Sequence, residues 1–318
     1  MSHYTVLQSV HFHRGKARWQ DAHATRTRID KEYGLLHKFD QQIRVAALRR
    51  KIIMLEVVAL YLVVGAIAGV LAGLLGIGGG LVIVPMLVFC MELQHLPQEL
   101  VMHLALGTSM ASIMFTSVSS FMAHHRRGAV EWSVVRRIVL GIIAGTYLGT
   151  HIAAGMSTGA LKVFFVIFLY YVCYQMLSGK KPKPSRHLPG NAGMFGAGGV
   201  IGVVSSLVGI GGGTLSVPFM VWHNIPIHKA IGTSAAIGFP IAVAGTIGYV
   251  VNGWNEPNLP PYSLGFVSLT ALVCIAVMSV LTAPLGVRLA HSLPVDKLKK
   301  VFAVILFLVG TRMLISLF

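Results

Sequence analysis

Charged residues are scarce in this chain. Only 11% of its 318 residues are Asp, Glu, Lys or Arg, and only 10 of them are acidic. Glu56 is the one acid well placed inside a long apolar run, and it follows the basic cluster Arg49, Arg50 and Lys51 by about one turn, as an interfacial partner for those cations would. Proton relays within a membrane use ionisable residues in mid-span, so a carboxylate relay has few candidates here.

Cysteine is also rare, and catalytic signatures are missing. Cys90, Cys173 and Cys274 stand singly in apolar segments, which predicts neither a disulfide framework nor a metal site. The sequence has no HExxH or Walker pattern and no Ser-His-Asp arrangement, which argues against an embedded hydrolase and an ATP-driven pump. Residues 1–50 lack the apolar stretch of a signal peptide. We therefore expect a protein that is not an enzyme and that uses no cofactor and no metal.

Apolar residues dominate instead. They make up 55% of the chain, and the mean hydropathy is +0.73. Several windows of about 20 residues, the length that crosses a bilayer core, carry almost no charge. The sequence thus predicts an all-α polytopic membrane protein, multi-pass in the cell (inner) membrane, with the lipid bilayer as a partner. The net charge of +16 lies mainly in the N-terminal tail and in short loops, which is the placement of topology signals and not of a nucleic-acid surface.

One glycine-rich motif occurs twice. Residues 73–85 read GLLGIGGGLVIVP and residues 206–218 read SLVGIGGGTLSVP, and 209 − 76 = 218 − 85 = 133. Three successive glycines are expected to break an apolar helix. Such breaks are tolerated at membrane depth only where the freed backbone lines a cavity enclosed by protein. Matching breaks in the two halves of a chain are a sequence pointer to a transporter's binding site.

Further repeats support a duplicated chain. Small residues spaced by four, at 65, 69 and 73, return as 198, 202 and 206 and predict close-packed helix faces. A Gly-Thr-Ser motif at 107–109 returns at 232–234, with an offset of 125, and residues 148–177 match 285–314 with an offset of 137. We therefore expect two homologous repeats of about four to five helical elements each. The expected domains are a basic cytoplasmic tail (1–51), a first repeat (52–178), a linker (179–190) and a second repeat (191–318).

Loop charge predicts that the two repeats are inverted. In the first half the basic loop follows the Gly-Thr-Ser helix, within residues 124–137, whereas residues 252–261 at the equivalent place contain no Lys or Arg. The next loop has the reverse bias, with Lys162 alone in the first half and four Lys or Arg within residues 288–300. Opposite bias at equivalent loops is typical of oppositely inserted halves. Strict inversion conflicts with a cytoplasmic basic tail, so the exact helix count and the N-terminal side stay open.

The glycine runs admit three interpretations. A dinucleotide-binding fingerprint would need a strand and a βαβ unit, which the membrane-length flanks do not provide. Glycines that serve helix packing alone remain an alternative. A helix that restarts after the glycines presents free N–H groups and the positive end of its dipole, which is an anion site without a charged side chain. On this third interpretation the backbone of one set of residues binds substrate: Gly78, Gly79, Gly80, Gly211, Gly212, Gly213 and Thr214.

The Gly-Thr-Ser motifs are candidate substrate contacts as well. Thr108, Ser109, Thr233 and Ser234 each follow a glycine near a predicted helix start, and their recurrence in both halves favours a role beyond local bonding. Bonding back to a carbonyl of the same helix is the alternative. His103 and His228 lie five residues ahead of the threonines, and a structural role is the simpler interpretation for them.

Taken together, these motifs resemble the TauE/SafE family of membrane permeases. The resemblance covers about residues 52–318 and is carried by GLLGIGGG with Val84 and Pro85, by residues 107–109, by HRRGAVEW at 125–132, and by the second set through Pro218 and residues 232–234. It implies a permease whose studied relatives are associated with export of sulfite, organosulfonates and related small anions. The basic tail is longer than expected for that family.

The function expected from these observations is a secondary transporter, working as an exporter, of a small sulfur oxyanion or organic anion. A passive anion channel of the same fold is one alternative, and a membrane-embedded structural or signalling partner is another. No nucleic-acid partner is expected. A homo-oligomer is compatible with the sequence, although nothing in it supports one. The identity of the anion, the direction of transport and the coupling ion are not specified by the sequence.

Overall fold

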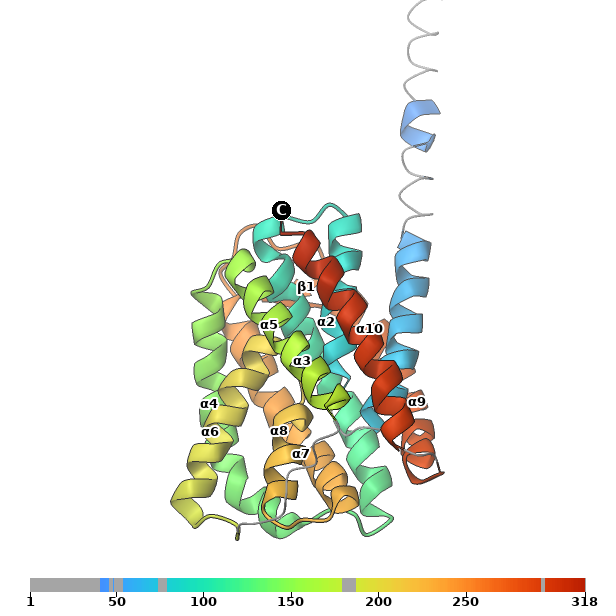
Figure 1. The fold of residues 1–318 in the computed structure, drawn as a ribbon. Coiled ribbons are helices and arrows are strands. Elements are labelled where there is room, and N and C mark those ends of the chain that lie inside the picture. Colours follow the sequence, from blue (N-terminus) through green and yellow to red (C-terminus); the bar gives the residue numbers. More distant parts are fainter. Residues whose placement is uncertain are drawn as a thin grey trace, which may run out of the picture. The chain divides into compact units, whose positions relative to one another are not determined.

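Uncharged apolar runs of this length fold as helices because lipid offers no partner for backbone N–H and C=O groups. The computed structural model describes residues 41–45, 48, 54–73, 79–178, 187–292 and 295–317. The chain divides into two units, residues 1–56 and 57–318. Apart from one two-stranded hairpin, the described part of the second unit is built from helices (Figure 1). The tail predicted over residues 1–51 and most of the linker lie largely outside the described residues.

The helices are as follows: Met54–Gly73, α2 Gly80–Leu93, α3 Gln98–His125, α4 Trp132–Ala154, α5 Thr158–Leu177, α6 Asn191–Val208, α7 Gly213–Trp222, α8 Ile227–Asn252, α9 Leu269–Ser292 and α10 Val295–Ile315. Among the described residues, seven helices are long and apolar enough to cross a bilayer. The helices after the two glycine runs, α2 and α7, are shorter. Described residues 54–178 and 187–317 thus provide five helices each, within the four to five expected of each repeat, and the chain is a polytopic all-α membrane protein.

Each small-residue face packs against a helix from the other half of the chain. Methyl groups at Gly65 and Gly69 would lie 2.7 Å from the carbonyl oxygen of Ile275 and 2.4 Å from that of Ser279, both on α9. In the same way, α6 packs on α4, where methyl groups at Gly198 and Gly202 would each lie 2.6 Å from a carbonyl oxygen, those of Ile138 and Ile142. Backbones approach this closely only where side chains are absent. The predicted close-packing faces are therefore confirmed, and they interlock the two halves.

The central pair of helices is α3 and α8, which pack against each other and, respectively, against α9 and α4. Of the candidate spans, α3 is the most enclosed, with 83% of its apolar window buried. The remaining long helices α5 and α10 pack together at one side of this core (Figure 1). The buried hydroxyl-bearing residues of α3 and α8 consequently lie in the interior and not at the lipid-facing surface.

A short hairpin joins α8 to α9. Its strands, β1 Ser263–Leu264 and β2 Val267–Ser268, pair antiparallel with Ser263 opposite Ser268 and Leu264 opposite Val267. Phe266 at its turn donates a backbone hydrogen bond to the Tyr249 carbonyl, 3.2 Å away. The hairpin therefore closes one end of α8 against the start of α9.

A partly buried ion pair holds the C-terminal end of α2. Lys162 of α5 donates a 2.8 Å hydrogen bond to a carboxylate oxygen of Glu92, and only 6% of the lysine side chain is exposed. Gln94 follows at the helix end and donates to the Tyr61 hydroxyl at 2.9 Å. The short helix α2 is thus tied at its C-terminal end by polar contacts, whereas its N-terminal end lies among glycines.

Candidate functional site

The second glycine run breaks its helix as predicted. Helix α6 ends at Val208, and Gly209 caps it in the left-handed region with φ of 71°. Gly212 has φ of 75° and precedes the first residue of α7. Both angles are open to glycine and disfavoured for residues with a Cβ. The GIGGG sequence at 209–213 therefore supplies two left-handed residues, which end one helix and start the next within the membrane-embedded core.

The first glycine run is described from Gly79 onward, and Gly78 lies outside the described residues. Gly79 adopts φ of 78° and precedes the first residue of α2, Gly80. A methyl group at Gly80 would lie 2.2 Å from the Gly209 carbonyl oxygen and 2.8 Å from the Ile210 Cα atom. The start of α2 therefore touches the break between α6 and α7, so glycine segments that are 133 residues apart in sequence meet in the core.

The N-terminus of α7 carries free backbone donors. The first bonds of the helix run from the N–H groups of Leu215 and Ser216 to the Gly212 carbonyl, at 3.1 and 2.8 Å. Among the described residues, no group accepts a hydrogen bond from the N–H groups of Gly213 and Thr214. These amides point out of the helix at the positive end of its dipole. They are suited to a ligand with acceptor oxygens and negative charge.

Two buried hydroxyls beside these amides also lack partners. Thr214 Oγ1 and Ser205 Oγ are enclosed and form no hydrogen bond within the described part of the chain. Ser205 Oγ lies 3.3 Å from where a methyl group on Gly212 would stand, which places it at the break. Thr146 Oγ1 is a third such hydroxyl, and it lies against Gly202, one turn before Ser205 on α6. Buried polar groups are almost always hydrogen-bonded, so this cluster marks a place suited to a ligand.

The threonines of the Gly-Thr-Ser motifs are used in the protein's own framework. Thr108 Oγ1 accepts the N–H of Ser268 at 2.9 Å, and Thr233 Oγ1 accepts the N–H of Glu131 at 2.8 Å. These bonds are equivalent, since 233 − 108 = 125 and 268 − 131 = 137 are the offsets of the repeats. The motifs also lie about two and a half to three turns inside α3 and about one and a half to two turns inside α8, because those helices begin at Gln98 and Ile227. Each threonine holds the segment that leads into α4 or α9.

The serines of the motifs lie closer to the breaks. Ser109 Oγ donates a 2.7 Å hydrogen bond to the carbonyl of Gly209, the residue that caps α6. Ser234 Oγ accepts a 3.0 Å hydrogen bond from Ser216 Oγ in the second turn of α7. Both serines are fully buried. Ser109 therefore supports the break from the other half of the chain, and Ser234 supports the helix that carries the free amides.

The two histidines ahead of the motifs have different surroundings. His103 is buried, its Nε2 is 3.0 Å from the Ala153 carbonyl oxygen, and its ring packs on Phe266 of the hairpin at 5.0 Å between centroids. His228 is exposed in the first turn of α8. His103 therefore packs between elements at one end of the bundle and is not part of the glycine-lined centre. Within the described residues, no three His, Cys, Asp or Glu side chains gather in a way that would hold a metal ion.

Comparison of the two halves identifies the hydroxyl-bearing residues that motif analysis missed. With the offset of 133, Ser205, Thr214 and Ser216 correspond to Ala72, Leu81 and Ile83. The two breaks therefore share their glycines but differ in polarity, because only the second adds hydroxyls. Thr214 was among the predicted residues, whereas Ser205, Ser216 and Thr146 were not. An alignment of the halves that tracked polar substitutions would have found the first two.

Comparisons with known proteins show the family of the chain. The family model for the sulfite exporter TauE/SafE matches residues 61–313. A probable membrane transporter protein of Haemophilus influenzae is 39% identical over 270 residues, which cover 83% of this chain and all of that protein. A probable membrane transporter protein of Methanocaldococcus jannaschii is 26% identical over 258 residues, covering 80% of this chain and 95% of that protein. No solved structure matches the chain. The chain therefore belongs to the TauE/SafE family of membrane transporters.

Proposed function

We propose that this protein is a secondary transporter that exports a small sulfur oxyanion or organic anion, of the sulfite or sulfonate type, across the cell membrane. The anion binds at the N-terminus of α7. The observation that carries the proposal is the set of unpartnered donors there: the amides of Gly213 and Thr214 and the buried hydroxyls of Thr214 and Ser205. The family name, sulfite exporter, supports the choice of substrate class.

The chemistry of these donors suits an oxyanion. Backbone N–H and hydroxyl groups each donate one hydrogen bond, and a sulfite or sulfonate group has several acceptor oxygens on one centre. Donors in a site enclosed by protein bind charge more strongly than in water. No charged side chain is needed, which leaves the site neutral when empty and limits the desolvation that a buried arginine or lysine would require.

The start of α2 completes the site from the other half of the chain. Gly79 and Gly80 bring a second helix N-terminus against the break between α6 and α7. Because Leu81 and Ile83 follow where the second half has Thr214 and Ser216, α2 contributes backbone groups and apolar walls. The substrate's charged end is therefore bound mainly by α7. Ser109 and Ser234 act as supports of the break, and Thr108 and Thr233 hold the framework behind it.

The interlocked halves suit alternating access. The first small-residue face packs against α9 and the second packs against α4, so the two halves contact each other through equivalent surfaces. We propose that the halves are inverted repeats, as loop charge predicts, and that they rock about the central breaks to open the site to either side. Glycine faces without side chains allow helices to slide with little repacking.

The proposal is tested by sulfite binding to purified protein and by flux in proteoliposomes. At 100 times its Kd, a ligand that binds only the folded state adds about 2.7 kcal/mol to the free energy of unfolding. Sulfite, sulfate, thiosulfate and sulfoacetate are compared by the shift of the unfolding midpoint. Saturable counterflow of the stabilising anion supports a carrier, whereas flux that rises linearly without exchange indicates a channel. Absence of any shift with all these anions would refute the proposed site.

Variants separate the site from the framework. Thr214→Val and Ser205→Ala each remove one donor to a charged ligand, a bond of about 1.5–3 kcal/mol, and should weaken binding about 10- to 150-fold. Neither hydroxyl has a partner in the described residues, so the free energy of unfolding of the ligand-free protein should not fall. Ser112→Ala is the matched control, because its hydroxyl bonds only the Thr108 carbonyl of its own helix. Unchanged affinity in both site variants would contradict this placement.

A further inference from the structure

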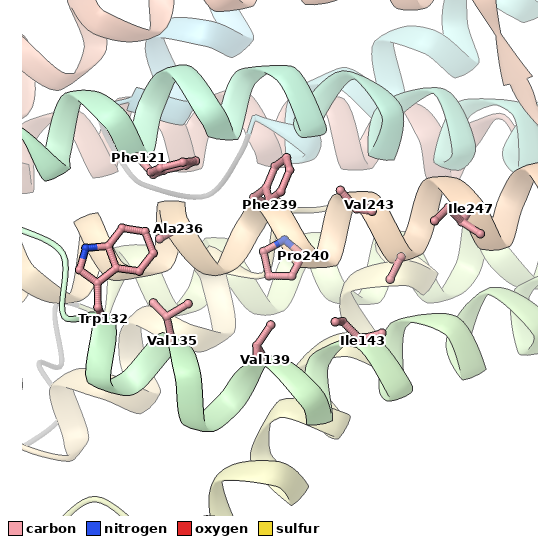
Figure 2. Close-up of a pocket in the computed structure, with 11 residues that line it drawn as sticks. Phe121, Trp132, Val135, Val139, Ile143, Ala236, Phe239, Pro240, Val243 and Ile247 are labelled. Atoms are coloured by element: carbon pink, nitrogen blue, oxygen red, sulfur yellow. The ribbon is translucent and has the colours of Figure 1, made fainter.

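The lipid-facing side of the bundle carries a long apolar groove. It lies between α4 and α8, with α3 at one edge, and has a volume of about 450 Å³, within the range of small-molecule sites. Figure 2 shows the side chains of α4 facing those of α8 along it. All its lining residues are apolar: Phe121, Trp132, Val135, Val139, Ile143, Ala236, Phe239, Pro240, Val243, Ala244 and Ile247. None of its lining residues belongs to the proposed transport site at the start of α7.

The groove has the length of one bilayer leaflet. Along α4 it runs from Trp132, the first residue of the helix, to Ile143, which is 11 residues at 1.5 Å each or about 16 Å. The hydrocarbon core of a bilayer is about 30 Å thick, so one leaflet is about 15 Å. Trp132 is 38% exposed and marks the interface end, as tryptophans in membrane proteins commonly do. A lipid chain that enters at Trp132 would follow the groove to mid-membrane.

The mouth of the groove is basic. Trp132 donates its indole N–H to His125 Nδ1 at 3.2 Å, and Arg126 follows in the same turn and is exposed. Arg136 is exposed one turn along α4. Within the described part of the chain, neither arginine forms an ion pair. The nearby carboxylate of Glu131 is already paired with Lys229 at 2.5 Å, so it does not offset these cations.

Helix geometry separates Arg136 from its neighbour Arg137. At about 100° per residue, Arg136 lies about 40° from the direction of Trp132, whereas Arg137 lies about 140° away. Val139 and Ile143 lie within about 20° of Trp132. Arg136 is therefore on the groove side of α4, and Arg137 is not. The chain thus offers two exposed arginines at the same depth, of which one can reach a headgroup at the mouth.

We propose that this groove binds an anionic phospholipid, with an acyl chain along α4 and α8 and the phosphate at Arg136 and Arg126. The occupant is a lipid because the lining is wholly apolar and leaflet-long, and it is anionic because the mouth is basic. A second copy of the chain is disfavoured as occupant, since two basic mouths would repel one another. The lipid lies beside α8 near Pro240. Helix α4 moves against α8 when the two halves move relative to each other as proposed for transport.

The test uses the fluorescence of Trp132. A variant with Trp19→Phe, Trp222→Phe and Trp254→Phe keeps Trp132 alone and is placed in phosphatidylcholine vesicles. One lipid in ten is replaced by phosphatidylglycerol or by phosphatidylcholine, each brominated on its acyl chains so that it quenches nearby indoles. Each arginine near the surface is worth about a fivefold preference for anionic lipid. Brominated phosphatidylglycerol should therefore quench Trp132 as if it were several-fold enriched over the bulk.

Matched variants locate the lipid. Arg136→Gln should lower the enrichment about fivefold, while Arg137→Gln should leave it unchanged. Val139→Phe, which narrows the groove without adding a tryptophan, should also lower it. Native mass spectrometry of the unmodified protein, with equal amounts of the two lipids unbrominated, provides a second measurement if the triple variant folds poorly. It should retain phosphatidylglycerol preferentially.

Three outcomes would overturn the proposal. Equal quenching by the two brominated lipids would show that the groove does not select negative charge. Equal effects of Arg136→Gln and Arg137→Gln would show attraction to the whole surface and not to the groove. Lack of quenching by either lipid, together with dimers in light scattering, would show that a second copy covers the groove. Because none of these readouts requires transport, failure here leaves the proposed anion site intact, and failure of that site leaves the lipid site intact.

Discussion

The hydrogen bond from Ser109 to Gly209 gives a quantitative test of how the second break is held. Ser109 Oγ donates to the Gly209 carbonyl at 2.7 Å, from a helix of the other half of the chain. Ser109→Ala removes this donor in a fully buried place and leaves a capping carbonyl without its side-chain partner. A buried polar group without a partner costs about 1–3 kcal/mol. We expect the free energy of unfolding to fall by that amount.

Ser112 provides the control for this prediction. It lies one turn further along α3 and is equally buried, but its hydroxyl donates at 2.8 Å to the carbonyl of Thr108 in its own helix. That carbonyl already takes part in the helix ladder, and such back-bonding contributes little to stability. Ser112→Ala should therefore change the free energy of unfolding by less than about 0.5 kcal/mol. The two variants delete the same atom from the same helix.

The assay is thermal or denaturant unfolding of the purified protein in detergent, followed by anion binding. Ser109→Thr should recover most of the lost stability, because it restores the hydroxyl. If Gly209 positions the start of α7, Ser109→Ala should also weaken anion binding even at temperatures where the variant is folded. Equal free energies of unfolding for Ser109→Ala and Ser112→Ala would refute the reasoning, because they would show that the hydrogen bond from Ser109 to Gly209 does not stabilise the protein.

Two further predictions concern packing and charge. Gly145→Ala places a methyl group 2.1 Å from the Gly199 carbonyl oxygen and should lower the free energy of unfolding by about 1–3 kcal/mol, less the gain of about 1 kcal/mol from helix propensity. The control Gly196→Ala on α6 meets no atom within 4 Å and should raise the free energy of unfolding by up to about 1 kcal/mol. A Gly145→Ala protein more stable than the unchanged chain would disprove the close contact. Lys162→Met removes the buried partner of Glu92, and because the Glu92 side chain is 27% exposed the cost should stay below the about 3–5 kcal/mol of a fully buried pair; the double change with Glu92→Leu should recover much of the loss. Denaturant titrations of all four proteins measure the free energy of unfolding. A double variant that is no more stable than Lys162→Met would contradict the prediction for the ion pair.

Much of the architecture could be predicted from local sequence. Apolar runs of membrane length dictate helices, and a GIGGG run dictates a break, because no side chain is present to disfavour left-handed backbone. Small residues every four positions likewise require a close helix neighbour. What these patterns left unspecified was the identity of the neighbour. Gly65 packs against α9, and Gly145 of α4 packs against α6, and a spacing of four does not indicate which helix will be opposite.

The roles of the hydroxyls were the least predictable part of the candidate site. Thr108 and Thr233 recur in both halves, and recurrence suggested substrate contacts, but their oxygens accept backbone N–H groups of segments more than 100 residues away. The recurrence thus includes a repeated framework bond, and contact of these threonines with substrate stays a prediction. The sequence does not predict a role for Ser205, because a serine near the end of an apolar helix is common. Its meaning comes from lying buried and unpartnered at the break.

The sequence by itself determined the class of molecule, the duplicated plan and the places where helices must stop, because each of these depends on neighbouring residues and on the absence of charge or of a Cβ. Tertiary structure alone decided that the start of α2 meets the end of α6, that Ser109 and Gly209 join the halves, and that the hydroxyls of Ser205 and Thr214 lie buried without partners among the described residues. The first two are contacts between segments 100 or more residues apart, and all three depend on which helix faces fit together and not on a local pattern.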